Sequence, residues 1–362
     1  MAKCIVVSAV NICDGGALTI LKDAIISFDK SANKEDKLHF LVSSPKVHSD
    51  IPTKNITFHY FPKSKKSWLA RIFFEYIYFY FLSKRIMPDA WLSLHDITPN
   101  VIAKKRYVYC HNPSIFLDFP IRDIQLDPKQ FLFSTFYKYL YKININKNHR
   151  VITQQAWLAE EFSKIYNLDN LLVSPPDTQN PNPRITISPP TDHSKKISCF
   201  YPAFPRYFKN HNILLDAAKS RCDIEFWLTI DGTENTHSKS LFNEKIPENV
   251  KPLGLLSKDR VFQLYSECDA LIFPSLLETW GLPITEFKST GKPIIVADLP
   301  YAHETVGDYE KVYWFDPKSR ASLLEALEKF IKGLPYDSPK PQPCRFEIIP
   351  GWLNLAKKII ND

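Results

Sequence analysis

The chain of 362 residues lacks the signals of a disulfide-stabilised, zinc-binding or membrane-spanning protein. Its seven cysteines are scattered and odd in number, and neither a CxxC pair nor a Cys/His ligand spacing occurs. This pattern argues against a disulfide framework and a zinc site. The first residues run into a strand-like segment without the apolar stretch and cleavage site of a signal peptide. The longest apolar run, 72–82, is interrupted by Glu75 and is far shorter than the roughly 20 residues that span a bilayer. We therefore expect a cytoplasmic protein without a transmembrane helix.

The composition is that of a folded protein with two domains. Hydrophobic residues make up 44% of the chain and charged residues 23%, which excludes a disordered chain, a fibre and a coiled coil. The length exceeds the roughly 250–300 residues at which a single core stops growing. Strand-like and helical segments alternate on both sides of a stretch with six prolines between residues 175 and 190. We predict two doubly wound α/β domains joined near residue 180, with a ligand-binding cleft between them.

The net charge of +7 lies entirely in the N-terminal half. Residues 1–180 contain 23 Lys and Arg against 16 Asp and Glu, whereas the remaining residues contain 23 of each. Such a field favours an anionic partner: a nucleic acid, a phosphorylated substrate or a membrane surface. No helix-turn-helix, zinc finger or RNP-like motif accompanies the charge, so we do not expect nucleic-acid binding.

Two segments of the N-terminal half are rich in aromatic and basic residues. Residues 68–82 and 131–142 are both predicted to be helices with apolar side chains over much of their surface, and lysines and an arginine flank the first. Most of these rings are expected to pack in the core. The alternative is that the rings lie in the headgroup layer of an anionic membrane. The two interpretations are compatible if only the outermost rings face lipid.

The segment 273–286 combines a strand end, a glycine turn and two carboxylates. Glu278 lies in the loop, Gly281 follows, and a helix is predicted to begin near Ile284 with Glu286 in its first turn. Backbone amides at a helix N-terminus bind anions, and carboxylates accept hydrogen bonds from sugar hydroxyls. Paired acids of this kind are also common as a helix cap and a surface charge.

This segment resembles the EX7E motif of family 4 glycosyltransferases, which have the GT-B fold. The spacing from Glu278 to Glu286 matches, inside the family's PSxxExxGLP frame. Further matches follow in the family's order: 291–297 resembles its G-x-P-V-I strand, 304–308 its E-V-x-G-D, and 315–317 its F-D-P. The resemblance is dense over residues 197–360 and thinner before them. It implies an N-terminal acceptor-binding domain (1–180), a C-terminal nucleotide-sugar-binding domain (181–345) and a final helix (346–362) that can return to the N-terminal domain.

The resemblance also implies roles for particular residues. The catalytic group would comprise Glu278, His111, Lys209 and Arg206. The residues that hold the nucleotide sugar would be Glu286, Gly15, Gly16, Thr279, Trp280, Gly281 and Leu282. In the family an Arg stands five residues before the diphosphate-binding Lys, and here that position is Phe204, so Arg206 is the candidate substitute. Asp14, beside the glycine pair, and the strand-end pair His95 and Asp96 are weaker candidates.

The reaction implied is transfer of a sugar from a nucleotide sugar, UDP- or GDP-linked, with retention of anomeric configuration. We favour front-face attack over a double displacement, because the resemblance does not place a nucleophilic carboxylate at the anomeric carbon. No DxD pair occurs, so no cofactor and no metal are expected. The acceptor would be a glycan or a polyprenyl-diphosphate-linked sugar in surface polysaccharide synthesis (O-antigen, capsule or lipopolysaccharide), handled in the cytoplasm at the inner face of the membrane. The alternatives are a non-catalytic GT-B scaffold and a GT-B sugar-nucleotide epimerase.

Overall fold

The computed structural model describes residues 2–13, 15–64, 67–177 and 196–362 and divides into two units. The first unit contains Met1–Asn112, Phe136–Asp177 and Cys344–Asp362, and the second contains Pro113–Thr135 and Thr178–Pro343. Most of the predicted proline-rich linker, and Asp14, lie outside the described residues. The segment 113–135, which the sequence placed in the N-terminal domain, groups with the second unit.

The first unit is built on a parallel eight-stranded sheet with the order β14-β7-β6-β5-β4-β1-β2-β3. Its strands are β1 (Cys4–Ala9), β2 (Lys37–Val42), β3 (Ile56–Tyr60), β4 (Ala90–Ser93), β5 (Lys105–Cys110), β6 (Arg150–Thr153), β7 (Leu171–Val173) and β14 (Glu347–Ile348). Its helices are α1 (Gly15–Ser31), α2 (Trp68–Phe73), the π-helical η2 (Phe74–Tyr78), α3 (Phe79–Ile86), α5 (Ala156–Tyr166) and α12 (Trp352–Asn361). Helix α4 (Pro128–Lys142) begins in the second unit and ends in the first.

The second unit is built on a parallel six-stranded sheet with the order β10-β9-β8-β11-β12-β13. Its strands are β8 (Ile197–Tyr201), β9 (Ile224–Leu228), β10 (Val250–Pro252), β11 (Ala270–Phe273), β12 (Ile294–Ala297) and β13 (Val312–Phe315). Its helices are α6 (His211–Ala218), α7 (Thr236–Leu241), α8 (Lys258–Glu267), α9 (Leu282–Lys288), α10 (Pro300–Val306) and α11 (Arg320–Ile331). Single-turn 3-10 helices complete the two units: η1 (Pro45–Val47), η3 (Pro113–Phe116), η4 (Ile121–Asp123), η5 (Ile145–Lys147) and η6 (Tyr207–Lys209).

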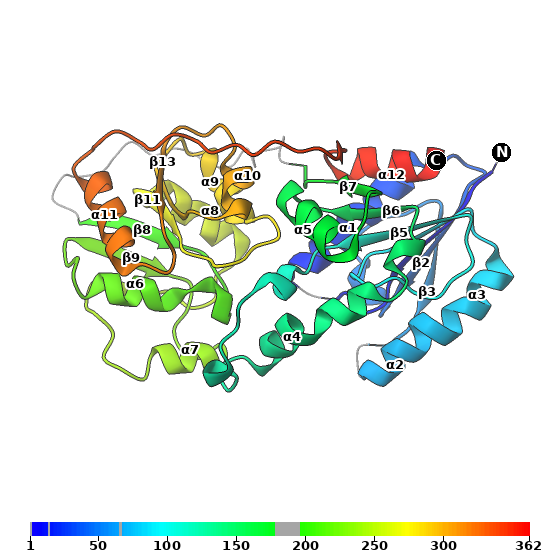
Figure 1. Cartoon of the computed structure of the whole chain (residues 1–362), viewed down its shortest axis with the longest axis horizontal. Helices are drawn as coiled ribbons and strands as arrows, with labels where there is room; N and C mark the ends of the chain where they lie inside the picture. The colour runs from blue at the N-terminus through cyan, green and yellow to red at the C-terminus, as the bar shows by residue number, and fades with distance from the viewer. Residues whose placement is uncertain (1, 14, 65–66, 178–195) are drawn as a thin grey trace. The chain divides into compact units, whose positions relative to one another are not determined.

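The central strands β4, β11 and β12 are buried along their whole length because helices flank each sheet (Figure 1). In the first unit the last helix, α12, packs against α1, and its buried residues Trp352, Leu355 and Ile359 join the core beneath β1 and β2. The chain thus ends on the domain in which it begins. These two doubly wound units confirm the predicted fold class.

Two local expectations differ from the structure. The glycine pair was expected in a loop, but Gly15 and Gly16 are the first two residues of α1, with Gly15 at a φ of +64°. The rings of residues 68–82 were expected mostly in the core, but Phe79 is their fully buried member, and Trp68, Phe73 and Phe81 are exposed. The cause lies in the spacing: the positions that face inward at every fourth residue hold Arg71, Glu75, Phe79 and Ser83.

Candidate active site

The predicted site residues of the second unit gather where its strand order reverses. Strands β8 and β11 are neighbours in the sheet, and their following segments turn to opposite sides, toward β9 and β12. In open parallel sheets this is the place where ligands bind, outside the carboxyl ends of the strands. The segment after β8 carries Lys209 at the end of η6, and the loop after β11 carries Glu278.

Lys209 and Glu278 form an ion pair at the centre of this region. Lys209 Nζ lies 2.5 Å from Glu278 Oε1, and both side chains are largely buried. Asn210, which has left-handed backbone angles at a φ of +56°, donates from its side-chain amide to the carbonyls of Pro274 and Pro317. Because these bonds tie the η6 turn to the loop after β11, the ammonium and the carboxylate are held at a fixed separation.

Two buried tyrosines hold the loops that carry this ion pair. Tyr201 donates to the carbonyl of Lys209 at 2.9 Å, and Tyr301 donates to the carbonyl of Ser275 at 2.8 Å. Burial raises the pKa of both phenols, and the nearby Glu278 carboxylate adds to the rise. Both rings therefore stay protonated and keep donating, which fixes the two loops against each other.

Arg206 forms an ion pair with Asp127, which was not among the predicted site residues. Its Nε lies 2.8 Å from Asp127 Oδ2, and the neighbouring Tyr207 donates to Asp123 at 2.8 Å. Phe204, at the position of the family's usual arginine, is 46% exposed. The charge of Arg206 is thus balanced by Asp127. Of the two cations predicted for the site, Lys209 is the one that pairs with Glu278.

The segment from Thr279 to Leu282 is shaped by its own contacts. Trp280 donates from its indole nitrogen to the hydroxyl of Thr285 at 2.9 Å, and Gly281 caps α9 at a φ of +83°. A Cβ at Gly281 would contact Ile284 at 3.4 Å, so glycine fits both the backbone angle and the available space.

Glu286 lies in a cavity of about 390 Å³ between α8, α9 and the end of β8. Leu282 and Tyr265 also line it, and the Tyr265 hydroxyl donates to Glu286 at 3.1 Å. Burial raises the pKa of Glu286. The volume is within the range of small-ligand pockets, and an apolar wall with one carboxylate suits a nucleoside whose hydroxyls need an acceptor.

The remaining predicted residues belong to the first unit. His111 follows β5, and Gly15 and Gly16 open α1 after β1. These residues follow the carboxyl ends of β5 and β1, two central strands. The strand order of this sheet reverses between β1 and β4, so the residues lie near the place where a doubly wound sheet binds its ligand.

The described part of the chain contains neither a metal-binding cluster nor a helix that could cross a membrane. Within residues 2–13, 15–64, 67–177 and 196–362, no group of three or more His, Cys, Asp or Glu side chains is arranged to hold a metal ion. In these same ranges no helix has both the length and the apolar character that crossing a bilayer requires.

Comparison with known proteins shows which proteins this chain resembles. Residues 183–338 match the family described as Glycosyl transferases group 1. Among solved structures, a glycosyltransferase from Rickettsia africae is similar with a TM-score of 0.63 at 15% identity, covering 99% of this chain and 92% of that one. Anabaena HepE in complex with UDP-glucose has a TM-score of 0.59 at 16% identity, covering 91% and 90%. The match of residues 183–338 and the similar structures support the resemblance seen in the sequence, that of a group 1 glycosyltransferase domain in a chain with the GT-B fold.

Among curated proteins, the O-antigen chain mannosyltransferase RfbU of Salmonella typhimurium is 22% identical over 245 residues. The match covers 64% of this chain and 66% of that relative, just under two thirds of its length.

Proposed function

We propose that the protein is a retaining glycosyltransferase that moves a sugar from a nucleotide sugar to a glycan or lipid-linked acceptor. The observation that carries the proposal is the Lys209–Glu278 pair, fixed at the reversal point of the second sheet within a matched group 1 glycosyltransferase domain. The cavity at Glu286 supports it, since it offers space and an acceptor for the nucleoside.

The charges present suit the separation of a diphosphate leaving group. As the bond to the sugar breaks, negative charge develops on the diphosphate, and a cation placed beforehand stabilises that charge. We assign this role to Lys209, which exchanges Glu278 for the phosphate oxygens and frees the carboxylate to accept hydrogen bonds from the donor sugar. Independence from metal ions follows from this assignment, because a fixed ammonium replaces the cation. We propose retention by front-face attack on the sequence resemblance, since no carboxylate is assigned as a nucleophile at the anomeric carbon.

We further propose a UDP- or GDP-sugar as donor and a polyprenyl-diphosphate-linked glycan as acceptor, in the synthesis of a surface polysaccharide. HepE was solved with UDP-glucose, and RfbU is named an O-antigen chain mannosyltransferase.

A non-catalytic scaffold is the second candidate, and one observation favours it. The residue at the family's usual arginine position is Phe204, and the nearby Arg206 is paired with Asp127. Binding of a nucleotide sugar without turnover is the outcome that this candidate predicts.

Donor binding tests the proposed nucleotide-sugar site. We expect one or a few of UDP-, GDP-, ADP- and dTDP-sugars to raise the melting temperature through mass action, and Glu286→Ala to weaken that donor by about tenfold through loss of a hydrogen-bonded acceptor. Glu325→Ala, an exposed carboxylate on α11, is the control and should leave binding unchanged. Equal affinity in the Glu286→Ala variant would remove Glu286 from the site.

We also propose that the first unit contacts an anionic membrane surface. The solvent-exposed side of α2, η2 and α3, here called the outer face, carries large apolar side chains. They are Trp68, Leu69, Ile72, Phe73, Ile77 and Phe81. Residues three or four apart lie on one side of a helix, so these side chains are neighbours. A contiguous exposed apolar surface marks an interaction site.

The inward side of this helical segment explains why its rings point outward. Arg71 Nε lies 2.8 Å from Glu75 Oε1, and both side chains are almost fully buried. A buried ion pair inside and apolar rings outside invert the usual pattern of a surface helix. Exposed Lys63, Lys84 and Arg85 flank the outer face, and this charge is complementary to anionic headgroups, so a bilayer is the occupant that we propose.

A further inference from the structure

Helix α4 has an exposed apolar side that the proposed function does not use. Four large apolar side chains at a spacing of three or four residues are between 41% and 60% exposed: Leu132, Phe136, Tyr139 and Ile143. Residues at this spacing lie on one side of a helix, so these side chains form a row, here called the α4 stripe. An exposed apolar row of this kind marks an interaction surface.

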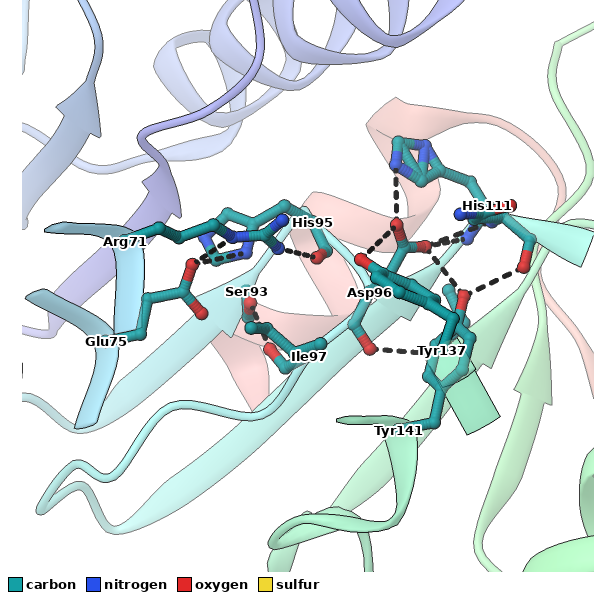
Figure 2. A network of polar contacts seen from close by, with 11 residues as sticks. Arg71, Glu75, Ser93, His95, Asp96, Ile97, His111, Tyr137 and Tyr141 are labelled. Atoms are coloured by element: carbon teal, nitrogen blue, oxygen red, sulfur yellow. Dashed lines mark hydrogen bonds and ion pairs between the residues drawn. The ribbon is translucent and has the colours of Figure 1, made fainter. Parts of the chain in front are cut away.

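The opposite side of α4 is polar and buried (Figure 2). Tyr137 and Tyr141 are 3% and 1% exposed. The Tyr141 hydroxyl donates to Asp96 Oδ1 at 3.0 Å, and the Tyr137 hydroxyl lies 3.5 Å from Asp96 Oδ2. Both hydroxyl groups thus point inward, whereas the side chains of the α4 stripe point outward. A surface helix normally has the reverse arrangement, with its apolar side against the core.

Asp96 fixes the inner side of α4 to the first sheet. The residue lies in the turn after β4 with a φ of +73°. Its Oδ1 also accepts from the backbone amides of His111 and Asn112 at 2.8 and 3.0 Å. One carboxylate therefore joins the ends of β4 and β5 to α4. A rotation of α4 that buried the α4 stripe would break these tyrosine hydrogen bonds, so the stripe stays exposed.

Helix α4 is a neighbour of α2, which carries part of the outer face. Arg71, on the inward side of α2, hydrogen-bonds the side chain of Tyr137 as well as that of Glu75. Both helices thus have polar groups on the inside and apolar side chains on the outside. The α4 stripe and the outer face are therefore two parts of one side of the first unit.

The other side of this sheet is covered by α1 and α12. Trp91 of β4 packs against Phe79 of α3 with 5.5 Å between the ring centres, whereas the next residue, Leu92, joins the core cluster of Leu355 on α12. Successive residues of a strand point to opposite faces of the sheet. Helices α3 and α12 therefore lie on opposite faces, and the exposed residues of α1 and α12 provide controls for the α4 stripe.

The charge around the α4 stripe is positive. Exposed Lys129, Lys138, Lys142 and Lys147 flank it, and the sequence from 128 to 150 contains neither Asp nor Glu. This charge is complementary to anionic headgroups, and apolar and aromatic side chains suit the boundary between headgroups and acyl chains. A second copy of the chain fits less well, because a two-fold contact would bring the same lysines together.

We propose that the α4 stripe is a second membrane-contact surface beside the outer face, and that an anionic bilayer is its occupant. The inference rests on the proposed membrane contact of the outer face, which it extends to a second helix. Once one of the two surfaces is bound, contact by the other is intramolecular and adds to the overall affinity. Loss of either surface should therefore weaken binding strongly.

Co-sedimentation with vesicles of phosphatidylglycerol and phosphatidylcholine tests the α4 stripe. Phe136→Glu with Tyr139→Glu should lower the apparent affinity at least about tenfold, because two apolar contacts are lost and two carboxylates are repelled by anionic lipid. The matched control is Ile26→Glu with Leu353→Glu, at exposed residues of α1 and α12. This control pair adds the same charge on the opposite face and should bind like the wild-type protein.

A second variant leaves the apolar side chains in place, and it tests the α4 stripe even if the glutamate pair fails to fold. Lys138→Gln with Lys142→Gln should weaken binding about fivefold or more at low ionic strength, since each lysine near the surface is attracted by anionic lipid. The difference from the wild-type protein should disappear in about 0.5 M salt, which screens the attraction. Unchanged binding at low ionic strength would remove the anionic bilayer as the occupant.

The remaining outcomes separate this inference from the proposed function. Wild-type affinity in the Phe136→Glu and Tyr139→Glu protein, when Leu69→Glu with Phe81→Glu has lost binding, would confine the contact to the outer face and overturn the inference. An equal loss in the control pair would overturn it too, as would a wild-type dimer that the α4 variant dissociates. A wild-type protein that ignores the vesicles would instead contradict the proposed membrane contact itself.

Discussion

Lys209→Ala is expected to lower the rate of sugar transfer by about 100- to 1,000-fold, the range seen when one group that stabilises a developing negative charge is removed. The reason is that Lys209 is the cation held in the centre of the second unit's site, at 2.5 Å from Glu278, while Arg206 is paired with Asp127. Steady-state release of the nucleoside diphosphate measures the effect. Donor affinity should fall less than kcat, because the leaving-group charge grows during the reaction.

The controls for this variant separate catalysis from folding. Truncation of Lys209 leaves the buried Glu278 carboxylate without its partner, which by itself destabilises a protein. Adding Glu278→Gln removes the lone charge, so a stability defect should be relieved while the rate stays low. Lys219→Ala, on an exposed ion pair with Asp216, should keep the full rate. A Lys209→Ala enzyme with more than about a third of the wild-type rate would exclude the assigned role.

The paired substitution Leu69→Glu and Phe81→Glu is expected to weaken binding to anionic vesicles strongly. These two side chains are 78% and 64% exposed on the outer face, so their replacement should not disturb the core. Burial of one large apolar side chain contributes about 1.5–3 kcal/mol, and the two new carboxylates are repelled by anionic lipid. Co-sedimentation with vesicles of phosphatidylglycerol and phosphatidylcholine should therefore fall at least about tenfold.

Two comparisons make this result specific. Leu334→Glu, at an exposed apolar residue of the second unit, should bind vesicles like the wild-type protein. Sedimentation without lipid tests the competing occupant, a second copy of the chain. If the wild-type protein ignores the vesicles, or if it self-associates through the outer face and the paired variant does not, the membrane proposal is wrong.

The sequence was sufficient to predict the alternation of strands and helices, because buried parallel strands form short apolar runs and their helices repeat at every third and fourth residue. It was also sufficient for the order of elements around Glu278, since a strand end, a loop and a helix start lie within 14 residues there. The helix start itself was placed too late: α9 begins at Leu282, so Glu286 lies beyond the first turn in which it was expected. Such patterns can be recognised from neighbouring residues alone.

The parts that were missed depend on contacts between distant segments. Asp127 reaches Arg206 across 79 residues of chain, and the left-handed turn at Asp96 is enforced by donors from β5 and α4. The outward rings of 68–82 were misjudged because an arginine and a glutamate occupy the inward positions. The i, i+4 spacing of Arg71 and Glu75 was the available signal, but the same spacing occurs in exposed pairs, and the burial of this pair became clear only from the structure.

Product analysis tests the central claim most directly. The purified protein is incubated with the donor selected by the binding panel and a synthetic polyprenyl-diphosphate-linked N-acetylhexosamine, and the new linkage is examined by proton NMR. The account predicts transfer that requires both the donor and the acceptor, proceeds in EDTA, and gives a glycosidic bond with the anomeric configuration of the donor. An inverted linkage would contradict the retaining mechanism, donor turnover without acceptor would favour an epimerase, and binding without turnover would favour the scaffold.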